Sequence, residues 1–287
     1  MPTLYVVATP IGNLNDLTPR MREALEAADL IAAEDTRVTM KLLNQFDLHR
    51  PMVSCHRHNE EAKAPRIVEK MLAEDLTVAL TCDAGTPGIS DPGHMMVDAC
   101  WAAGIPVEPV CGPSAVVTCL SASGFDAREF AFYGFLPREK KALREKLQQM
   151  AAGVPIGIVH ESPHRVTALV EAAAETIPGV RLSLSCDLTK LHEKTIRGTA
   201  EEVLAQLAAN PNAEKGEYCL ILDFHHVEKA GQEEQLQPAS LEAQLTDWML
   251  TGLTLREAQE KLTALGAKKN AVKAAALRLK KTMEEQL

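Results

Sequence analysis

Three loops rich in glycine and proline contain the residue types that let a small ligand lie close to the backbone. They are Thr9-Pro10-Ile11-Gly12-Asn13, the segment 83–93, and Gly112-Pro113-Ser114-Ala115. Glycine permits close approach of a ligand, and proline keeps a loop stiff. One such loop is more often an ordinary turn, but three of them, each just after an expected strand, favour a single small-molecule site.

Two further segments place carboxylates where an expected strand ends and a helix begins. Residues 34–37 are Glu-Asp-Thr-Arg, and residues 161–165 are Glu-Ser-Pro-His-Arg. The first segment is also explained by Asp35 or Thr36 capping a helix, with Arg37 in solvent. In the second, Ser162 as N-cap and Pro163 at the first helical position explain the pattern but leave Glu161 without a structural reason.

The segment 187–194, Asp-Leu-Thr-Lys-Leu-His-Glu-Lys, crowds ionisable groups between two expected strands. Such a segment could hold an acid–base pair, and it could equally be a charged hairpin loop. Both interpretations stay open at this stage.

Several common ligand motifs are missing from the sequence. There is no G-x-x-x-x-G-K-[ST] segment, and the glycines of 83–93 do not fit G-x-G-x-x-G, which argues against an ATPase or an ordinary dinucleotide enzyme. The H-x-H of Cys55-His56-Arg57-His58 lacks further ligands at a familiar spacing. We therefore expect no metal site.

Short apolar runs alternate with helical spacing over the first 125 residues. Strands are expected at 4–8, 30–33, 77–82 and 107–111, and helices from Thr18-Pro19 and near 37–46, 59–75, 91–104 and 113–123. Strands separated by helices form a parallel sheet, whose carboxyl-end loops line one crevice. This arrangement would bring the three glycine and proline loops together.

The rest of the chain predicts a second α/β domain and a helical extension. A connector at 125–137 leads to strands at 154–160, 181–187, 194–198 and 217–224, with helices near 163–176 and 199–209; this second sheet is expected to be mixed. A linker at 228–238 precedes helical segments at 241–250, 255–265 and 271–283, the last two forming a helix-turn-helix-like hairpin. The predicted domains are 1–125, 126–227 and 228–287.

Charge and hydropathy narrow the class of protein. The net charge of −9 argues against coating nucleic acid non-specifically, although the residues from Thr254 onward carry eight Lys and Arg against four Asp and Glu. No apolar run reaches the length of a membrane span, and the N-terminus lacks a signal peptide's basic region. Seven cysteines without a C-x-x-C pair are expected to be reduced and buried. A cytoplasmic protein is expected.

The ordered motifs resemble those of the ribosomal RNA small subunit methyltransferase I family, in the tetrapyrrole-methylase superfamily. The resemblance runs from about residue 4 to 222 and includes Ala33-Glu34-Asp35-Thr36-Arg37, Ser90-Asp91-Pro92-Gly93, Gly134-Phe135-Leu136-Pro137 and Lys215-Gly216-Glu217 besides the loops above. It implies two α/β domains with S-adenosylmethionine in the cleft between them, and a homodimer. It also implies 2'-O-methylation of a cytidine in the decoding region of 16S ribosomal RNA, within the 30S subunit, and no membrane partner.

The resemblance also implies which residues contact the cofactor. They lie in the three loops of the first domain and in three segments of the second: Pro10, Ile11, Gly12, Asp83, Ala84, Gly85, Thr86, Pro87, Ile89, Pro113, Ser114, Ala115, Phe135, Leu136, Glu161, Lys215, Gly216 and Glu217.

The ribose hydroxyl needs a base that removes its proton, within about 3 Å. Candidates are Asp35, Glu161, Lys190 and Glu193, with Arg37 positioning a phosphate or orienting a carboxylate.

The chain departs from the family pattern at several positions. Cys82 replaces a serine, Cys111 a proline and His160 a tyrosine; Cys186-Asp187 replaces an Arg-Glu pair, and Asp223-Phe224 replaces Glu-Gly. Two alternatives to RNA methylation stay open. The superfamily relation and the acidic main body allow methylation of a small molecule such as a tetrapyrrole, and the departures at Cys186-Asp187 and Asp223-Phe224 allow a ribosome-binding factor that has lost catalysis. The basic extension favours the RNA enzyme over the small-molecule one.

Overall fold

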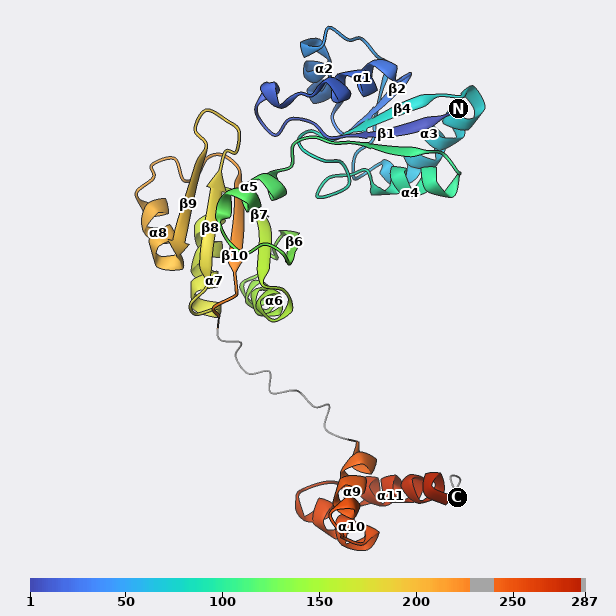
Figure 1. Cartoon of the computed structure of the whole chain (residues 1–287), viewed down its shortest axis with the longest axis vertical. Coiled ribbons are helices and arrows are strands. Elements are labelled where there is room, and N and C mark those ends of the chain that lie inside the picture. Colours follow the sequence, from blue (N-terminus) through green and yellow to red (C-terminus); the bar gives the residue numbers. More distant parts are fainter. Residues whose placement is uncertain (228–239, 285–287) are drawn as a thin grey trace. The chain divides into compact units, whose positions relative to one another are not determined.

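The computed structural model describes residues 1–227 and 240–284, which form two separate units, with the division of the chain at Val227 and Glu228 (Figure 1). The expected linker at 228–238 lies outside the described residues.

A five-stranded parallel sheet lies at the centre of the first 125 residues, in the order β3-β2-β4-β1-β5. Its strands are β1 (Thr3–Val7), β2 (Leu30–Ala33), β3 (Met52–Ser54), β4 (Thr77–Thr81) and β5 (Val107–Val110). The sequence did not indicate β3, because it has only three residues, follows a proline and is half-buried. The parallel sheet itself is as expected.

Helices cover both faces of this sheet (Figure 1). The short 3-10 helix η1 (Leu14–Asp16) precedes α1 (Pro19–Ala27), which pairs with α2 (Thr36–Gln45) on one face, around Met21, Leu25 and Ile31; α3 (Glu60–Glu74) and α4 (His94–Ala102) pack on the other, around Met71 and Met96. Thr18 caps α1 and Pro19 is its first residue, as expected.

The second sheet is mixed, as expected, in the order β6-β7-β10-β8-β9. Its strands are β6 (Phe130–Phe135), β7 (Ile156–Glu161), β8 (Arg181–Cys186), β9 (Lys194–Thr199) and β10 (Tyr218–Asp223). The prediction of a connector at 125–137 was wrong in part, because β6 pairs parallel with β7 at the sheet edge, where its aromatic residues are half-buried or exposed.

The two faces of the second sheet have different partners. On one face α6 (Lys140–Gly153), α7 (Val166–Thr176) and α8 (Ala200–Ala208) enclose the largest core of the chain's described part. On the other face α5 (Ala115–Ser123) packs on β7 and β10, and Ile11 from the first domain joins this cluster with Leu188. Apolar contact therefore ties the first glycine and proline loop to the second sheet.

The prediction that Ser162 caps a helix and Pro163 opens it was wrong. Residues 163–165 form a turn in which the amides of Arg165 and Val166 bond the Ser162 carbonyl, and α7 begins at Val166. The cysteine prediction also needs correction. All seven are free, but Cys111 is exposed and Cys186 only half-buried.

The second unit is a three-helix cluster of α9 (Leu241–Leu250), α10 (Leu255–Ala264) and α11 (Lys269–Glu284). Its small core is formed by Leu245, Leu262, Val272 and Ala275, among others. No helix of the residues described is long and apolar enough to cross a membrane.

Candidate functional site

A cavity of about 410 Å³ lies where loops of the first domain meet the second sheet. From the first domain it is lined by the loops that follow β1 and β4 and by the start of α5. From the second it is lined by the ends of β6 and β7, the turn after β8 and the residues before β10. The backbones of Thr9 and Gly85 hydrogen-bond each other in both directions, at 2.8 and 3.0 Å, which fixes two of these loops together.

Glu161, the last residue of β7, places a buried carboxylate in this cavity. The residue is 3% exposed, and Oε1 accepts hydrogen bonds from the backbone amide and hydroxyl of Ser162 at 2.7 and 3.2 Å. Oε2 lies 3.3 Å from the Arg165 guanidinium but has no hydrogen-bond partner within the described part of the chain. A buried carboxylate oxygen that accepts no hydrogen bond is costly even beside a cation, so this atom is suited to accept a hydrogen bond from a ligand.

The loop between β8 and β9 folds over the first glycine and proline loop. The Asn13 amide donates to Thr189 Oγ1 at 3.1 Å, and a Cβ on Gly12 would lie 2.7 Å from Lys190 Cγ. Asp187 and Thr189 have φ values of 50° and 66°, which non-glycine residues adopt only when their surroundings hold them there. The loop is therefore fixed by contacts on both sides.

Lys190 joins two carboxylates at the edge of the cavity. Its ammonium group lies 3.2 Å from Asp187 Oδ1 and 2.9 Å from Glu217 Oε2. Burial lowers the pKa of Lys190, but the hydrogen bonds and charges of Glu217 and Asp187 outweigh burial and raise it above its usual value. Lys190 is thus a cation here, which argues against it as a neutral base.

The carboxylates of Glu34, Asp83 and Asp91 gather near the carboxyl ends of β2 and β4. Glu34 Oε2 accepts from the Asp83 amide at 3.2 Å, and Asp83 Oδ1 accepts from the Asp35 amide at 3.1 Å. Burial raises the pKa of Glu34, Asp83 and Asp91, and repulsion from neighbouring carboxylates raises each further. Asp91 lines the cavity, so this cluster places negative potential beside it.

Asp35 is the N-cap of α2, as the capping interpretation predicted, and accepts from the Arg37 amide at 2.8 Å. The Arg37 guanidinium pairs with the same carboxylate, while its side chain is 86% exposed. These contacts, the side-chain hydrogen bond above all, lower the pKa of Asp35 to about 2. A carboxylate this acidic is a weak base at neutral pH.

The structure brings only part of the sequence-predicted cofactor set to the cavity wall. Seven of those residues line it: Ile11, Ala84, Ala115, Phe135, Glu161, Gly216 and Glu217. Pro10 and Asp83 line a separate hollow beside α2, Lys215 and Pro87 line two others, and Leu136 is buried in the second core.

The remaining predicted residues have other contacts. Gly12 lies under Lys190, Gly85 pairs with Thr9, and Thr86 Oγ1 approaches the Pro113 carbonyl at 3.5 Å. Ile89 is exposed, and Ser114 precedes α5. Glu193 accepts a hydrogen bond from the Thr189 amide, so it serves the β8–β9 loop.

Sequence reasoning missed several residues of the cavity wall. His160, Leu188 and Tyr218 lie next to predicted residues but were not chosen. The His160 ring packs edge-on against Phe132 at 4.9 Å between centroids, and burial lowers the pKa of this imidazole. The position of Tyr218 could have indicated it, because it begins β10 directly after the predicted segment 215–217 and pairs with Glu161 of β7.

The comparisons with known proteins decide the family. The family model for Tetrapyrrole (Corrin/Porphyrin) Methylases matches residues 3–204. The chain is 43% identical to "Ribosomal RNA small subunit methyltransferase I" of Halalkalibacterium halodurans, over 82% of this chain and 78% of that protein. It is 42% identical to the protein of the same name from Vibrio cholerae, over 96% of this chain and 93% of that one. The chain belongs to the ribosomal RNA small subunit methyltransferase I family.

Solved structures agree on the fold. The uroporphyrin-III C-methyltransferase of Thermus thermophilus, in complex with S-adenosylhomocysteine, matches with a TM-score of 0.53 and 18% identity, over 77% of this chain and 97% of that one. At this identity the likeness shows the tetrapyrrole-methylase fold alone. As for metals, residues 1–227 and 240–284 contain no group of three or more His, Cys, Asp or Glu that could hold an ion.

Proposed function

We propose that this methyltransferase transfers a methyl group from S-adenosylmethionine to the 2'-oxygen of a cytidine in the decoding region of 16S ribosomal RNA. The names of its relatives support ribosomal RNA as substrate, and the motif resemblance supports the finer assignment. On the same grounds we propose that it acts in the cytoplasm as a homodimer on the 30S subunit. The observation that carries the chemistry is the cavity with the buried Glu161 carboxylate, whose Oε2 accepts no hydrogen bond within the described residues.

The residues around the cavity fit this cofactor. S-adenosylmethionine supplies an electrophilic methyl group on a sulfonium, and it also carries N–H donors. Glu161 Oε2 offers a buried acceptor to such a donor, and Asp91 with its neighbours offers negative potential to a cation. Apolar groups of Ile11, Ala84 and Phe135 complete the wall.

The four candidates for the base differ in what already occupies them. Lys190 is held as a cation, Glu193 is bonded to the Thr189 amide, and Asp35 is paired with Arg37. Glu161 lines the cavity, and its Oε2, although ion-paired with Arg165 at 3.3 Å, accepts no hydrogen bond within the described part of the chain. We therefore place Glu161 in contact with the reacting groups and assign Asp35 to orienting the exposed Arg37 toward an RNA phosphate.

The rate enhancement in this proposal comes mainly from positioning. Methyl transfer is an in-line displacement, so holding the ribose oxygen in line with the methyl group lowers the barrier. The β8–β9 loop, fixed by Lys190 and Asn13, supplies a rigid wall for that purpose. The division of the first unit at residue 125 also remains our proposal, with one domain for each sheet.

The test is transfer of a labelled methyl group from S-adenosylmethionine to 30S subunits that lack the modification, followed by nuclease digestion and mass spectrometry. Recovery of 2'-O-methylcytidine is the expected result. No incorporation into the subunits, together with transfer to a tetrapyrrole offered in a parallel reaction, would favour the small-molecule alternative. Cofactor binding without any transfer would favour a ribosome-binding factor that has lost catalysis.

A further inference from the structure

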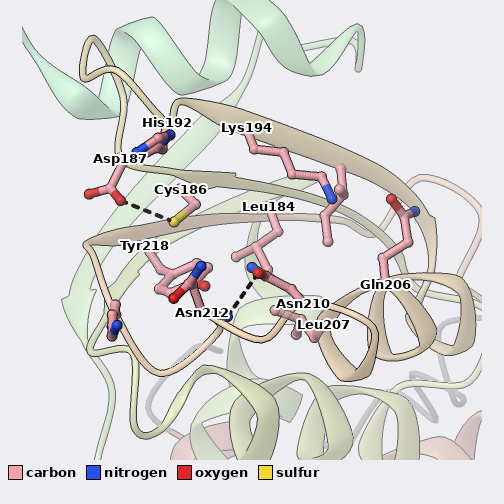
Figure 2. Close-up of a pocket in the computed structure, with 12 residues that line it drawn as sticks. Leu184, Cys186, Asp187, His192, Lys194, Gln206, Leu207, Asn210, Asn212 and Tyr218 are labelled. Carbon is pink, nitrogen blue, oxygen red and sulfur yellow. Dashed lines mark hydrogen bonds between the residues drawn. The ribbon is translucent and has the colours of Figure 1, made fainter.

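A second cavity, of about 600 Å³, lies within the second α/β domain (Figure 2). Its walls come from the ends of β8 and β9, the last turn of α8 and the segment 210–218. Neither the family resemblance nor the proposed reaction assigns a role to it as a pocket. Its chemistry differs from that of the cofactor cavity.

The pocket has an apolar floor and a polar rim. Leu184, Ile196, Leu207 and Tyr218 are buried and form the floor, with the Tyr218 hydroxyl bonded to the Ala213 carbonyl at 3.0 Å. The rim is exposed and carries cations and amides. It is formed by His192, Lys194, Gln206, Asn212 and Lys215. Figure 2 shows Lys194 and Gln206 at one end of the pocket, and His192 with Asp187 at the other.

The rim has an excess of positive charge. No ion pair of Lys194 or Lys215 is found among residues 1–227 and 240–281, for which side chains are described. The one carboxylate in the lining, Asp187, is already paired with Lys190 at 3.2 Å. In a chain with a net charge of −9, this pocket is a local site for an anion.

The pocket adjoins the cofactor cavity through a wall only one or two residues thick. Asp187 lines the second pocket and Leu188 the cofactor cavity; likewise Lys215 lines the second pocket and Gly216 the cofactor cavity. Tyr218 lines both. A polymer with one unit against a cofactor bound in the first cavity would therefore have its neighbouring unit within reach of the second pocket.

We propose that this pocket binds a nucleotide of single-stranded RNA next to the nucleotide that is methylated. The base would lie on the apolar floor, where Gln206 and Asn212 can meet its polar edge, and Lys194 and Lys215 would contact the adjoining phosphate. The identity of the ligand rests on the proposed function, whereas its chemical class rests on the pocket.

Binding of RNA tests the pocket independently of turnover. The probe is a short fluorescein-labelled single-stranded RNA with the decoding-region sequence, titrated with the full chain and followed by anisotropy. Lys194→Ala should weaken binding about three- to tenfold and lower the salt slope by about 0.7, as expected for one lost phosphate contact on a single strand. Lys194→Arg should retain the affinity, because it keeps the charge.

The matched control is Lys70→Ala, which removes the same charge from the exposed surface of α3. It should bind the RNA like the wild type, and all three variants should bind S-adenosylmethionine with wild-type affinity in calorimetry. Any of three results would overturn the assignment of RNA binding to this pocket. They are wild-type RNA affinity in Lys194→Ala, an equal loss of affinity in Lys70→Ala, and no RNA binding by the wild type.

Kinetics on unmethylated 30S subunits separate this inference from the proposed function. Lys194→Ala should raise KM for subunits about three- to tenfold with kcat within twofold of the wild type. If the wild type is active and Lys194→Ala has an unchanged KM, the pocket assignment is wrong and the proposed function stands. If Lys194→Ala weakens RNA binding while the wild type transfers no methyl group, the pocket stands and the proposed function is wrong.

Discussion

A substitution of Glu161 tests the cofactor site without changing the rest of the fold. Glu161→Gln keeps the shape of the side chain but removes its charge, and a hydrogen bond to a charged group contributes about 1.5–3 kcal/mol. We therefore expect S-adenosylmethionine to bind about 10- to 100-fold more weakly, as measured by calorimetry. The control is Glu171→Gln on α7, which lies outside this cavity. Unchanged affinity in Glu161→Gln would restrict Glu161 to proton transfer.

Gly216 matters because of its conformation and its neighbour. Its φ is +89°, and a Cβ there would lie 2.5 Å from Asp187 Oδ2, the carboxylate that pairs with Lys190. Gly216→Ala should destabilise the fold by about 1–3 kcal/mol in urea denaturation and displace Asp187 from Lys190. Gly179→Ala is the control, since its φ is also positive, +80°, but nothing lies within 4 Å. Equal losses in the two variants would show that backbone strain alone is at work.

The start of helix α4 depends on a buried carboxylate from helix α3. Glu60 is 2% exposed, and its Oε1 accepts from the backbone amides of Gly93, Met95 and Met96 at 2.8–3.2 Å. These are N–H groups that a helix start cannot satisfy itself. Glu60→Ala should lower the free energy of unfolding by about 3 kcal/mol, because three buried donors lose a charged acceptor. The exposed neighbour Glu61→Ala should change it by less than about 0.5 kcal/mol.

The carboxylates near the ends of β2 and β4 should lower the stability of the fold and raise its affinity for the cofactor. Since burial, and then Asp83, raises the pKa of Asp91, the ionised form is disfavoured by folding, and its stability contribution falls as pH rises through that raised pKa. Asp91→Asn should therefore raise Tm at pH 7 by about 2 °C and weaken S-adenosylmethionine binding. Asp98→Asn, on the exposed side of α4, should do neither. A lower Tm in Asp91→Asn would show that its charge is stabilising.

Strands with a clear apolar run could be predicted from the sequence, and strands with a weak apolar pattern could not. Leu30–Ala33 and Thr77–Thr81 are buried runs that any sheet needs, so their strands were evident. Met52–Ser54 and Phe130–Phe135 lie at sheet edges, where no residue is fully buried and the apolar pattern carries little signal. Ser162 and Pro163 match the pattern of a helix start. In the structure, however, the Ser162 hydroxyl donates a hydrogen bond to the Glu161 carboxylate, and the segment forms a turn of the site.

The same limit applies to the site. Loop sequence and family resemblance placed Ile11, Ala84 and Glu161 among the ligand-contacting residues, and these do line one cavity. They could not indicate that Glu193 is occupied by the Thr189 amide or that Lys190 is held by two carboxylates. Such pairings depend on how the β8–β9 loop folds onto a segment more than 170 residues away in sequence.

Charge is distributed unequally over the whole molecule. The residues from Thr254 onward carry a local charge of +4, so the first 253 residues carry −13. The first unit contains the cofactor cavity and its own cores, and the helical unit has a separate core around Leu245 and Leu262. We infer a division of labour in which the first unit does the chemistry and the helical unit adds affinity for the RNA particle.

A chain ending at Val227 tests this division. It should keep wild-type S-adenosylmethionine affinity, because every residue that lines the cofactor cavity lies before that point. Its KM for unmethylated 30S subunits should rise at least about tenfold, and the salt dependence of subunit binding should become shallower, since basic residues that displace counterions are lost. A full-length chain with Lys268, Lys269 and Lys273 changed to Gln is the matched variant, since it keeps the helices and removes charge alone. Unchanged KM and salt dependence in both would show that the helical unit has no part in RNA binding, and loss in the truncation alone would assign the effect to shape rather than charge.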